Sequence, residues 1–109
     1  MKPVDFDAMK TSATEVEALL SLLANRHRLM VLCQLIDGEK SVGQLLAPST
    51  LSQSALSQHL AKLRDANLVT TRRDGQTIHY SIASAAAQTL IETLCELYGP
   101  DGPEHAPSD

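Results

Sequence analysis

Residues 51–64 combine small hydrogen-bonding side chains with an apolar stripe at helical spacing. Leu56, Leu60 and Leu63 lie at positions i, i+4 and i+7, which predicts one buried helix face. A solvated helix face usually carries Glu and Lys, whereas serine and glutamine predominate here. Short neutral donors and acceptors suit the base edges that line a DNA groove. The residues we expect to face bases are Gln53, Ser54, Ser57 and Gln58.

Catalysis is a poor interpretation of the same segment. His59 lies close to Ser57, but no carboxylate that would orient the histidine and no oxyanion loop is suggested nearby, so we expect no enzyme. We expect His59 either to hold this helix in place or to touch phosphate. Basic side chains in and after this segment are interpreted as contacts to phosphate or groove walls, although a solvated turn is the alternative for the two arginines at 72 and 73. They are Lys62, Arg72 and Arg73, with Arg26 and Arg28 left evenly open.

The charge of the chain is distributed unevenly along its 109 residues. The formal net charge is −4, which by itself argues against nucleic acid. Residues 52–82, however, carry four basic side chains against two acidic ones, whereas residues 83–109 carry five acidic and no basic ones. Binding to phosphate depends on the local field, so the centre of the chain can approach DNA while its acidic ends stay away.

Periodicity and turn residues predict a mainly α fold with one β-hairpin. The order of helix, helix, helix-turn-helix, hairpin and helix is that of a winged helix-turn-helix domain, in which the recognition helix enters the major groove and the hairpin reaches the neighbouring backbone. We expect the first and last helices to form a homodimer interface, which suits a palindromic double-stranded DNA operator. The expected segments are a flexible leader (1–10), a domain (11–99) and an acidic disordered tail (100–109). Within the domain we expect helices over 14–23, 26–36, from 41, from 52 and over 85–98, and a hairpin over 68–82 that turns at Asp74-Gly75 as type I′. The expected N-caps of the last four helices are Asn25, Ser41, Ser52 and Ser84.

Hydropathy and the first residues of the chain indicate its cellular location. No run of 18 apolar residues is present, so no membrane span is expected, and residues 1–7 do not resemble a signal peptide. We therefore expect a cytoplasmic protein. Its two cysteines, Cys33 and Cys95, are then reduced by default.

Three motifs together carry a family resemblance. They are Leu23-Ala24-Asn25-Arg26-His27-Arg28-Leu29, the stretch 51–64 with Ser-x-x-Ser-x-His-Leu at 54–60, and Arg72-Arg73-Asp74-Gly75-Gln76-Thr77-Ile78-His79-Tyr80. The chain resembles the ArsR family of small dimeric repressors over about residues 14–98. Within that family it is most similar to the sulfide-, persulfide- and oxidant-sensing branch of BigR, SqrR and HlyU. The resemblance implies a repressor that an inducer releases from DNA.

The family's metal sites do not match this sequence. Where arsenic and cadmium sensors carry Cys-Val-Cys, this chain has Ser41-Val42-Gly43. Where zinc and nickel sensors carry Asp-x-His, it has Ser84-Ala85-Ala86 and no later histidine in the helix. We expect no metal and no cofactor; His105 with Asp101 and Glu104 is at most a weak metal site.

The branch's sensing thiols match only in part. Cys33 occupies the position of the first thiol on the second helix, but Gly99 stands where the second thiol ends the last helix. Cys95 lies one turn earlier, a displacement of ~6 Å along the helix that either breaks or preserves disulfide reach. The hypothesis is that reactive sulfur or an oxidant modifies Cys33 together with Cys95 and shifts the dimer away from its operator. The alternatives are inert cysteines packed as small hydrophobes and a metal response through a non-standard site; the lack of Cys-x-x-Cys argues against a redox enzyme.

Overall fold

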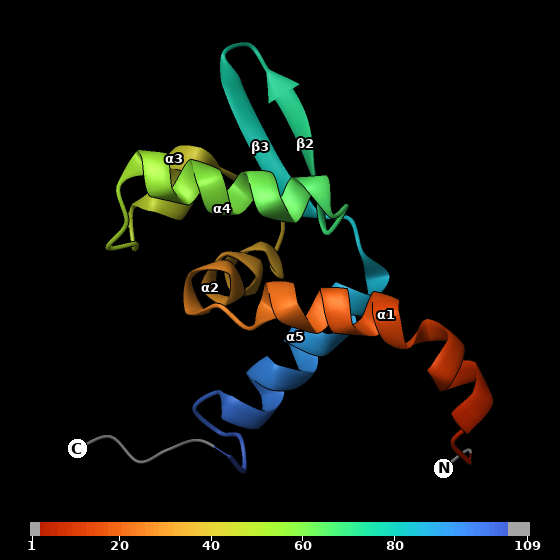
Figure 1. The fold of residues 1–109 in the computed structure, drawn as a ribbon. Coiled ribbons are helices and arrows are strands. Elements are labelled where there is room, and N and C mark those ends of the chain that lie inside the picture. The colour runs from red at the N-terminus through yellow and green to blue at the C-terminus, as the bar shows by residue number, and fades with distance from the viewer. Residues whose placement is uncertain (1–2, 105–109) are drawn as a thin grey trace.

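The computed structural model describes residues 3–104, which form a three-stranded sheet and five helices (Figure 1). Helix α2 is central, since it contacts α1, α4 and α5. The hairpin of β2 and β3 projects from the helical body beside α4, as the wing of a winged helix does (Figure 1). The elements are α1 (Phe6–Leu23), α2 (Arg26–Leu35), β1 (Lys40–Ser41), α3 (Val42–Leu46), α4 (Gln53–Asp65), β2 (Val69–Asp74), β3 (Thr77–Ile82) and α5 (Ala85–Tyr98).

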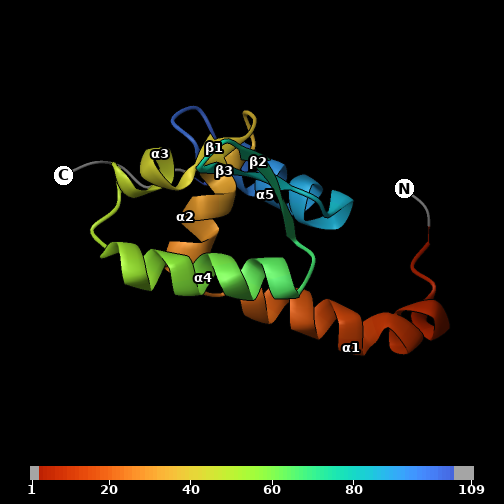
Figure 2. The ribbon, with the colours of Figure 1, turned by 90° about the horizontal axis from the view of Figure 1, so that it is seen from above.

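Helix α1 is longer than its apolar pattern predicts. It begins at Phe6 rather than Thr14, because the side chain of Asp5 accepts a hydrogen bond from the backbone N–H of Ala8 at 3.0 Å. An N-cap of this kind satisfies one of the free N–H groups of the first turn. Residues 6–10 of the expected leader are therefore helical, while residues 1–2 lie outside the described part. Figure 2 shows α1 extending well beyond the rest of the body.

The helix-turn-helix forms where polar caps interrupt apolar runs. Asn25 caps α2 by accepting from the N–H groups of His27 and Arg28, and Ser52 caps α4 by accepting from Ala55. Both caps were predicted. The chain leaves α2 through Gly38, whose φ of 134° is a conformation that L residues rarely adopt. The fully buried side chains that join these helices are aliphatic: Leu32, Leu45, Leu56, Leu60, Leu63 and Ile91.

The sheet differs from the sequence prediction in two respects. A short strand, β1, pairs with β3, so the order is β1-β3-β2; two residues are too few to show a strand period. The hairpin turn also lies one residue later than expected. Asp74 pairs with Thr77, which leaves Gly75 and Gln76 as the turn residues. Only Gly75 has positive φ (64°), so the type I′ prediction is wrong; glycine at the first position is typical of type II′.

Helix α5 begins after the predicted cap Ser84 and ends at Tyr98. The chain then turns back on the helix, because the N–H of Glu104 donates to the carbonyl of Leu97 at 2.8 Å. Residues 100–104 are thus held as turns, whereas residues 105–109 of the expected tail, including His105, lie outside the described part. The boundaries proposed for leader, domain and tail stay predictions.

Candidate DNA interface and thiol pair

The polar surface of α4 is exposed as the sequence predicted. Its three leucines are buried against the body, so the rest of the helix faces outward (Figure 2). Helix propensity alone would leave a helix of 13 residues marginal, and this burial is what holds it in place. The predicted DNA-facing residues Gln53, Ser54, Ser57, Gln58 and Lys62 are all exposed, as are Ala61, Arg64 and Asp65 nearer the end of the helix.

His59 lies apart from that exposed group. Its ring is partly buried against the start of α2, with the centroid 5.6 Å from that of His27 and Nδ1 3.4 Å from Nη1 of Arg28. Desolvation, followed by the charges of Arg28, His27 and Lys62, lowers the pKa of His59. These contacts with Arg28 and His27 are those that the first expected role, holding α4 in place, requires, and the phosphate contact stays a prediction.

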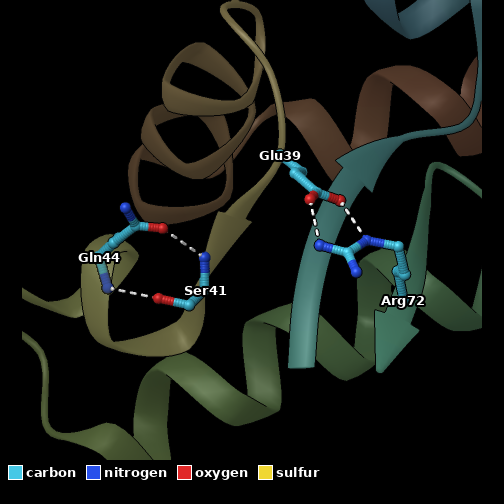
Figure 3. Close-up of polar contacts among 4 residues, drawn as sticks. All are labelled: Glu39, Ser41, Gln44 and Arg72. Atoms are coloured by element: carbon cyan, nitrogen blue, oxygen red, sulfur yellow. Dashed lines mark hydrogen bonds and ion pairs between the residues drawn. The ribbon is translucent and has the colours of Figure 1, made fainter. Parts of the chain in front are cut away.

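Arg72 and Arg73 point to opposite faces of the wing. Neighbouring residues alternate along a strand, and Arg72 pairs with His79 whereas Arg73 pairs with Ile78. Arg72 donates from Nε (3.1 Å) and Nη2 (2.5 Å) to the carboxylate of Glu39, and this ion pair raises the pKa of Arg72 (Figure 3). Arg73 is exposed and makes no ion pair with any residue from 3 to 104. Arg73 is therefore the wing arginine whose charge is available to phosphate.

In arsenic and cadmium sensors of the family, cysteine ligands occupy the positions of Ser41 and Gly43, and in this structure Ser41 is the N-cap of α3. The Ser41 side chain accepts from the N–H of Gln44, and the Gln44 side chain accepts from the N–H of Ser41, which is a capping box (Figure 3). Across residues 3–104 there is no group of three His, Cys, Asp or Glu side chains able to hold a metal ion. In the same part of the chain no helix has the length and apolar character of a membrane span.

The two cysteines meet although they lie 62 positions apart in the chain. Sγ of Cys95 on α5 lies 3.8 Å from Sγ of Cys33 on α2, and both thiols are free. Cys95 is exposed while Cys33 is partly buried. Burial, together with the hydrogen bond and charge of Cys95, raises the pKa of the Cys33 thiol to about 11. The one-turn displacement to Cys95 therefore preserves contact with Cys33.

Comparison with known proteins identifies the family. The model of the bacterial regulatory protein arsR family matches residues 25–71. The transcriptional activator HlyU of Vibrio cholerae is 45% identical over 96 residues, which are 88% of this chain and 89% of that protein. The chain belongs to the ArsR family. The biofilm growth-associated repressor of Agrobacterium fabrum is 44% identical and covers 89% of this chain, with 87% of its own length matched. The solved structure of reduced HlyU from Vibrio cholerae superposes with a TM-score of 0.81 at 45% identity, covering 86% of this chain and 99% of that one.

These relatives confirm several predictions. The fold is a winged helix-turn-helix, the branch is that of HlyU and BigR, and the chain is a transcriptional regulator rather than an enzyme. ArsR regulators bind DNA and are typically dimers.

Sequence reasoning missed two polar contacts. It did not single out Glu39, because a carboxylate before a two-residue strand gives no local sign of a partner in another strand. It left Arg28 open as a phosphate contact, whereas its guanidinium donates to the carbonyl of Leu22 at 2.8 Å. Arg26 is exposed at the start of α2 and stays open.

Proposed function

We propose that this protein is a homodimeric repressor that binds a palindromic operator through α4 and the wing and leaves it when Cys95 and Cys33 are modified by a reactive sulfur species or an oxidant. The observation that carries the proposal is the pair of free thiols 3.8 Å apart, which joins α2 to α5. The proposal includes a cytoplasmic, reducing location, where both thiols stay free until an inducer arrives.

Cys95 is the thiol that reacts first. A thiolate is the nucleophile, and a pKa of about 11 leaves only about one Cys33 in ten thousand ionised at pH 7. Cys95 is also the exposed member of the pair. Its thiolate attacks the outer sulfur of a low-molecular-weight persulfide, forming Cys95–S–SH and releasing the carrier thiol. Cys33, after losing its proton, then attacks the Cys95 sulfur, which forms the disulfide and expels hydrosulfide. With a peroxide, Cys95–SOH forms first and water leaves in the second step.

Closing the pair moves one helix relative to another. A disulfide holds its sulfurs about 2.05 Å apart, so the sulfurs must approach by about 1.8 Å. Helix α2 contacts the recognition helix α4, while α5 is the last helix of the predicted dimer interface. The shift therefore changes the position of α4 in one protomer relative to α4 in the other. A coupling of roughly 1–3 kcal/mol is enough to change operator affinity five-fold or more.

The surface of α1 and α5 supports the dimer. Large apolar side chains are exposed on both helices, and a recess of about 320 Å³ opens between them beside Leu20 and Leu94. Exposed apolar patches of this kind mark interfaces. The exposed large apolar side chains are Phe6, Met9 and Leu20 on α1 and Leu90, Leu94 and Tyr98 on α5.

The test is a mobility shift on a duplex selected from a random library by binding to the reduced protein. A persulfide donor or hydrogen peroxide should weaken binding by wild type, and peptide mass spectrometry should find Cys33 linked to Cys95. Cys95→Ser should bind as wild type does and resist both reagents, whereas Cys33→Ser should accumulate modification at Cys95 without the link.

Two results would overturn the thiol switch. The first is unchanged affinity of wild type after either reagent, which would leave the cysteines as packing residues. The second is release by Zn²⁺ alone, which would instead assign a metal response. Failure of the reduced protein to select any duplex would overturn the DNA-binding half of the proposal.

A further inference from the structure

Arg28 connects the end of α1 to the recognition helix. Its Nε donates to the carbonyl of Leu22 at 2.8 Å and its Nη2 to that of Ser21 at 3.4 Å, both in the last turn of α1. Its Nη1 lies 3.4 Å from Nδ1 of His59 on α4. Because α1 ends in carbonyl groups that lack partners within the helix, these bonds hold the guanidinium in one place.

The contact with Arg28 determines which nitrogen of His59 carries the proton. A guanidinium has donors only and stays protonated, so Nδ1 of His59 must be the acceptor. A neutral imidazole with Nδ1 as acceptor carries its proton on Nε2. Burial and the neighbouring Arg28, His27 and Lys62 lower the pKa of His59, which keeps the ring neutral.

The Nε2–H group of His59 is open to solvent. None of residues 3–104 accepts a hydrogen bond from it, as Arg28 is the only hydrogen-bonding neighbour of the ring within that part. No buried side-chain nitrogen in the described part of the chain lacks a partner, so this unpaired nitrogen is not buried. The charged and titratable groups that influence the ring are all bases, namely His27, Arg28 and Lys62, and they create a field that favours an anion.

We propose that Nε2–H of His59 donates a hydrogen bond to a DNA phosphate oxygen, and that Arg28 is the positioning residue that fixes this tautomer. The inference rests on the proposed docking of α4 on DNA and goes beyond it by naming the donor atom and the residue that orients it. It also makes α1, through Arg28, part of the support of a DNA contact.

The test compares two neutral replacements of one side chain. In His59→Gln the amide NH2 group can reach the position of Nε2, whereas in His59→Asn the shorter side chain reaches only the position of Nδ1, where its oxygen can accept from Arg28. Binding is measured by fluorescence anisotropy on a random-sequence duplex of about 30 bp at low salt, since a phosphate contact does not depend on sequence. His59→Gln should bind within about twofold of wild type, and His59→Asn should bind about tenfold more weakly, because a hydrogen bond to a charged group is lost.

The relative DNA affinities of the two variants decide between the phosphate contact and a purely structural role. If His59 served only to hold α4 through Arg28, Asn would keep an acceptor near Nδ1 and would be the better replacement. Equal binding by both variants, or better binding by His59→Asn, overturns the inference. If wild type itself binds no duplex, the proposed function fails instead.

A spectroscopic measurement tests the positioning role without DNA. Nitrogen-15 NMR of wild type should show His59 as the Nε2–H tautomer. Arg28→Lys keeps the charge but loses the planar fork, so it should give a mixture of tautomers and bind the duplex more weakly. A wild-type ring protonated on Nδ1 would overturn the inference, and this result does not depend on whether the variants in the binding assay fold.

Discussion

A disulfide between Cys33 and Cys95 should strongly stabilise the fold, and the size of the effect follows from the chain between them. The two residues are 62 positions apart. In the chain-entropy model, closing a loop of that length removes about 14 cal/mol/K from the unfolded state, which is about 4 kcal/mol at 25 °C. The sulfurs are already 3.8 Å apart in the reduced fold, so we expect the small shift between α2 and α5 that closes the bond to offset only a small part of this gain.

The prediction becomes a shift in melting temperature. A domain of about 100 residues unfolds with an entropy of about 0.2 kcal/mol/K, so about 4 kcal/mol raises Tm by about 20 °C. Oxidised and reduced protein are compared by circular dichroism at one fixed concentration, because the Tm of a dimer depends on concentration. Cys95→Ser, treated with the same oxidant, is the matched control and should not shift.

A small or negative shift in Tm would contradict the expected stabilisation by the disulfide. If the oxidised protein, shown by mass spectrometry to carry the intramolecular link, melts less than about 5 °C above the reduced form, strain cancels most of the entropic gain. The two thiols would then not be prepositioned for the bond, and the contact at 3.8 Å would not represent the reduced fold.

Two other predictions concern His59 and the wing. The pKa of His59 in the folded protein lies below its unfolded value of about 6.5, so the unfolded state takes up a proton first as pH falls. The free energy of unfolding should therefore decrease as pH drops below about 6.5. Chemical denaturation between pH 7.5 and pH 5.5 should show a smaller decrease for His59→Gln than for wild type. Arg73→Ala should reduce the slope of log affinity against log salt by about 0.9, the value for one phosphate, while Arg72→Ala should reduce it less because Glu39 already neutralises that side chain. An equal slope change in both variants would contradict the assignment of the two wing faces.

Features that depend on neighbours in the chain were predictable. The caps Asn25, Ser41, Ser52 and Ser84 and the buried leucines of α4 lie where helical period and capping chemistry place them. The polar surface of α4 follows from the same period. The start of α1 was missed because its first turns carry little apolar pattern and depend on Asp5 as a cap.

Pairings across the fold were not predictable from local pattern. The hairpin turn was placed one residue early, since the register of β2 and β3 depends on which face packs inward. The ion pair of Arg72 with Glu39 joins a residue of β2 to the residue just before β1, and β3 lies between those two strands, so no sequence spacing predicts it.

By itself the sequence determined a winged helix with a serine- and glutamine-rich recognition helix, because amphipathic period and caps are local properties. It left open whether Cys95, one turn before Gly99, still reaches Cys33. Only the packing of α5 against α2 decided that the two sulfurs meet, and only the packing of α2 against α4 turned His59 toward Arg28. The reason is physical: the distance between residues far apart in the chain is set by how the helices pack together, which no single helix encodes.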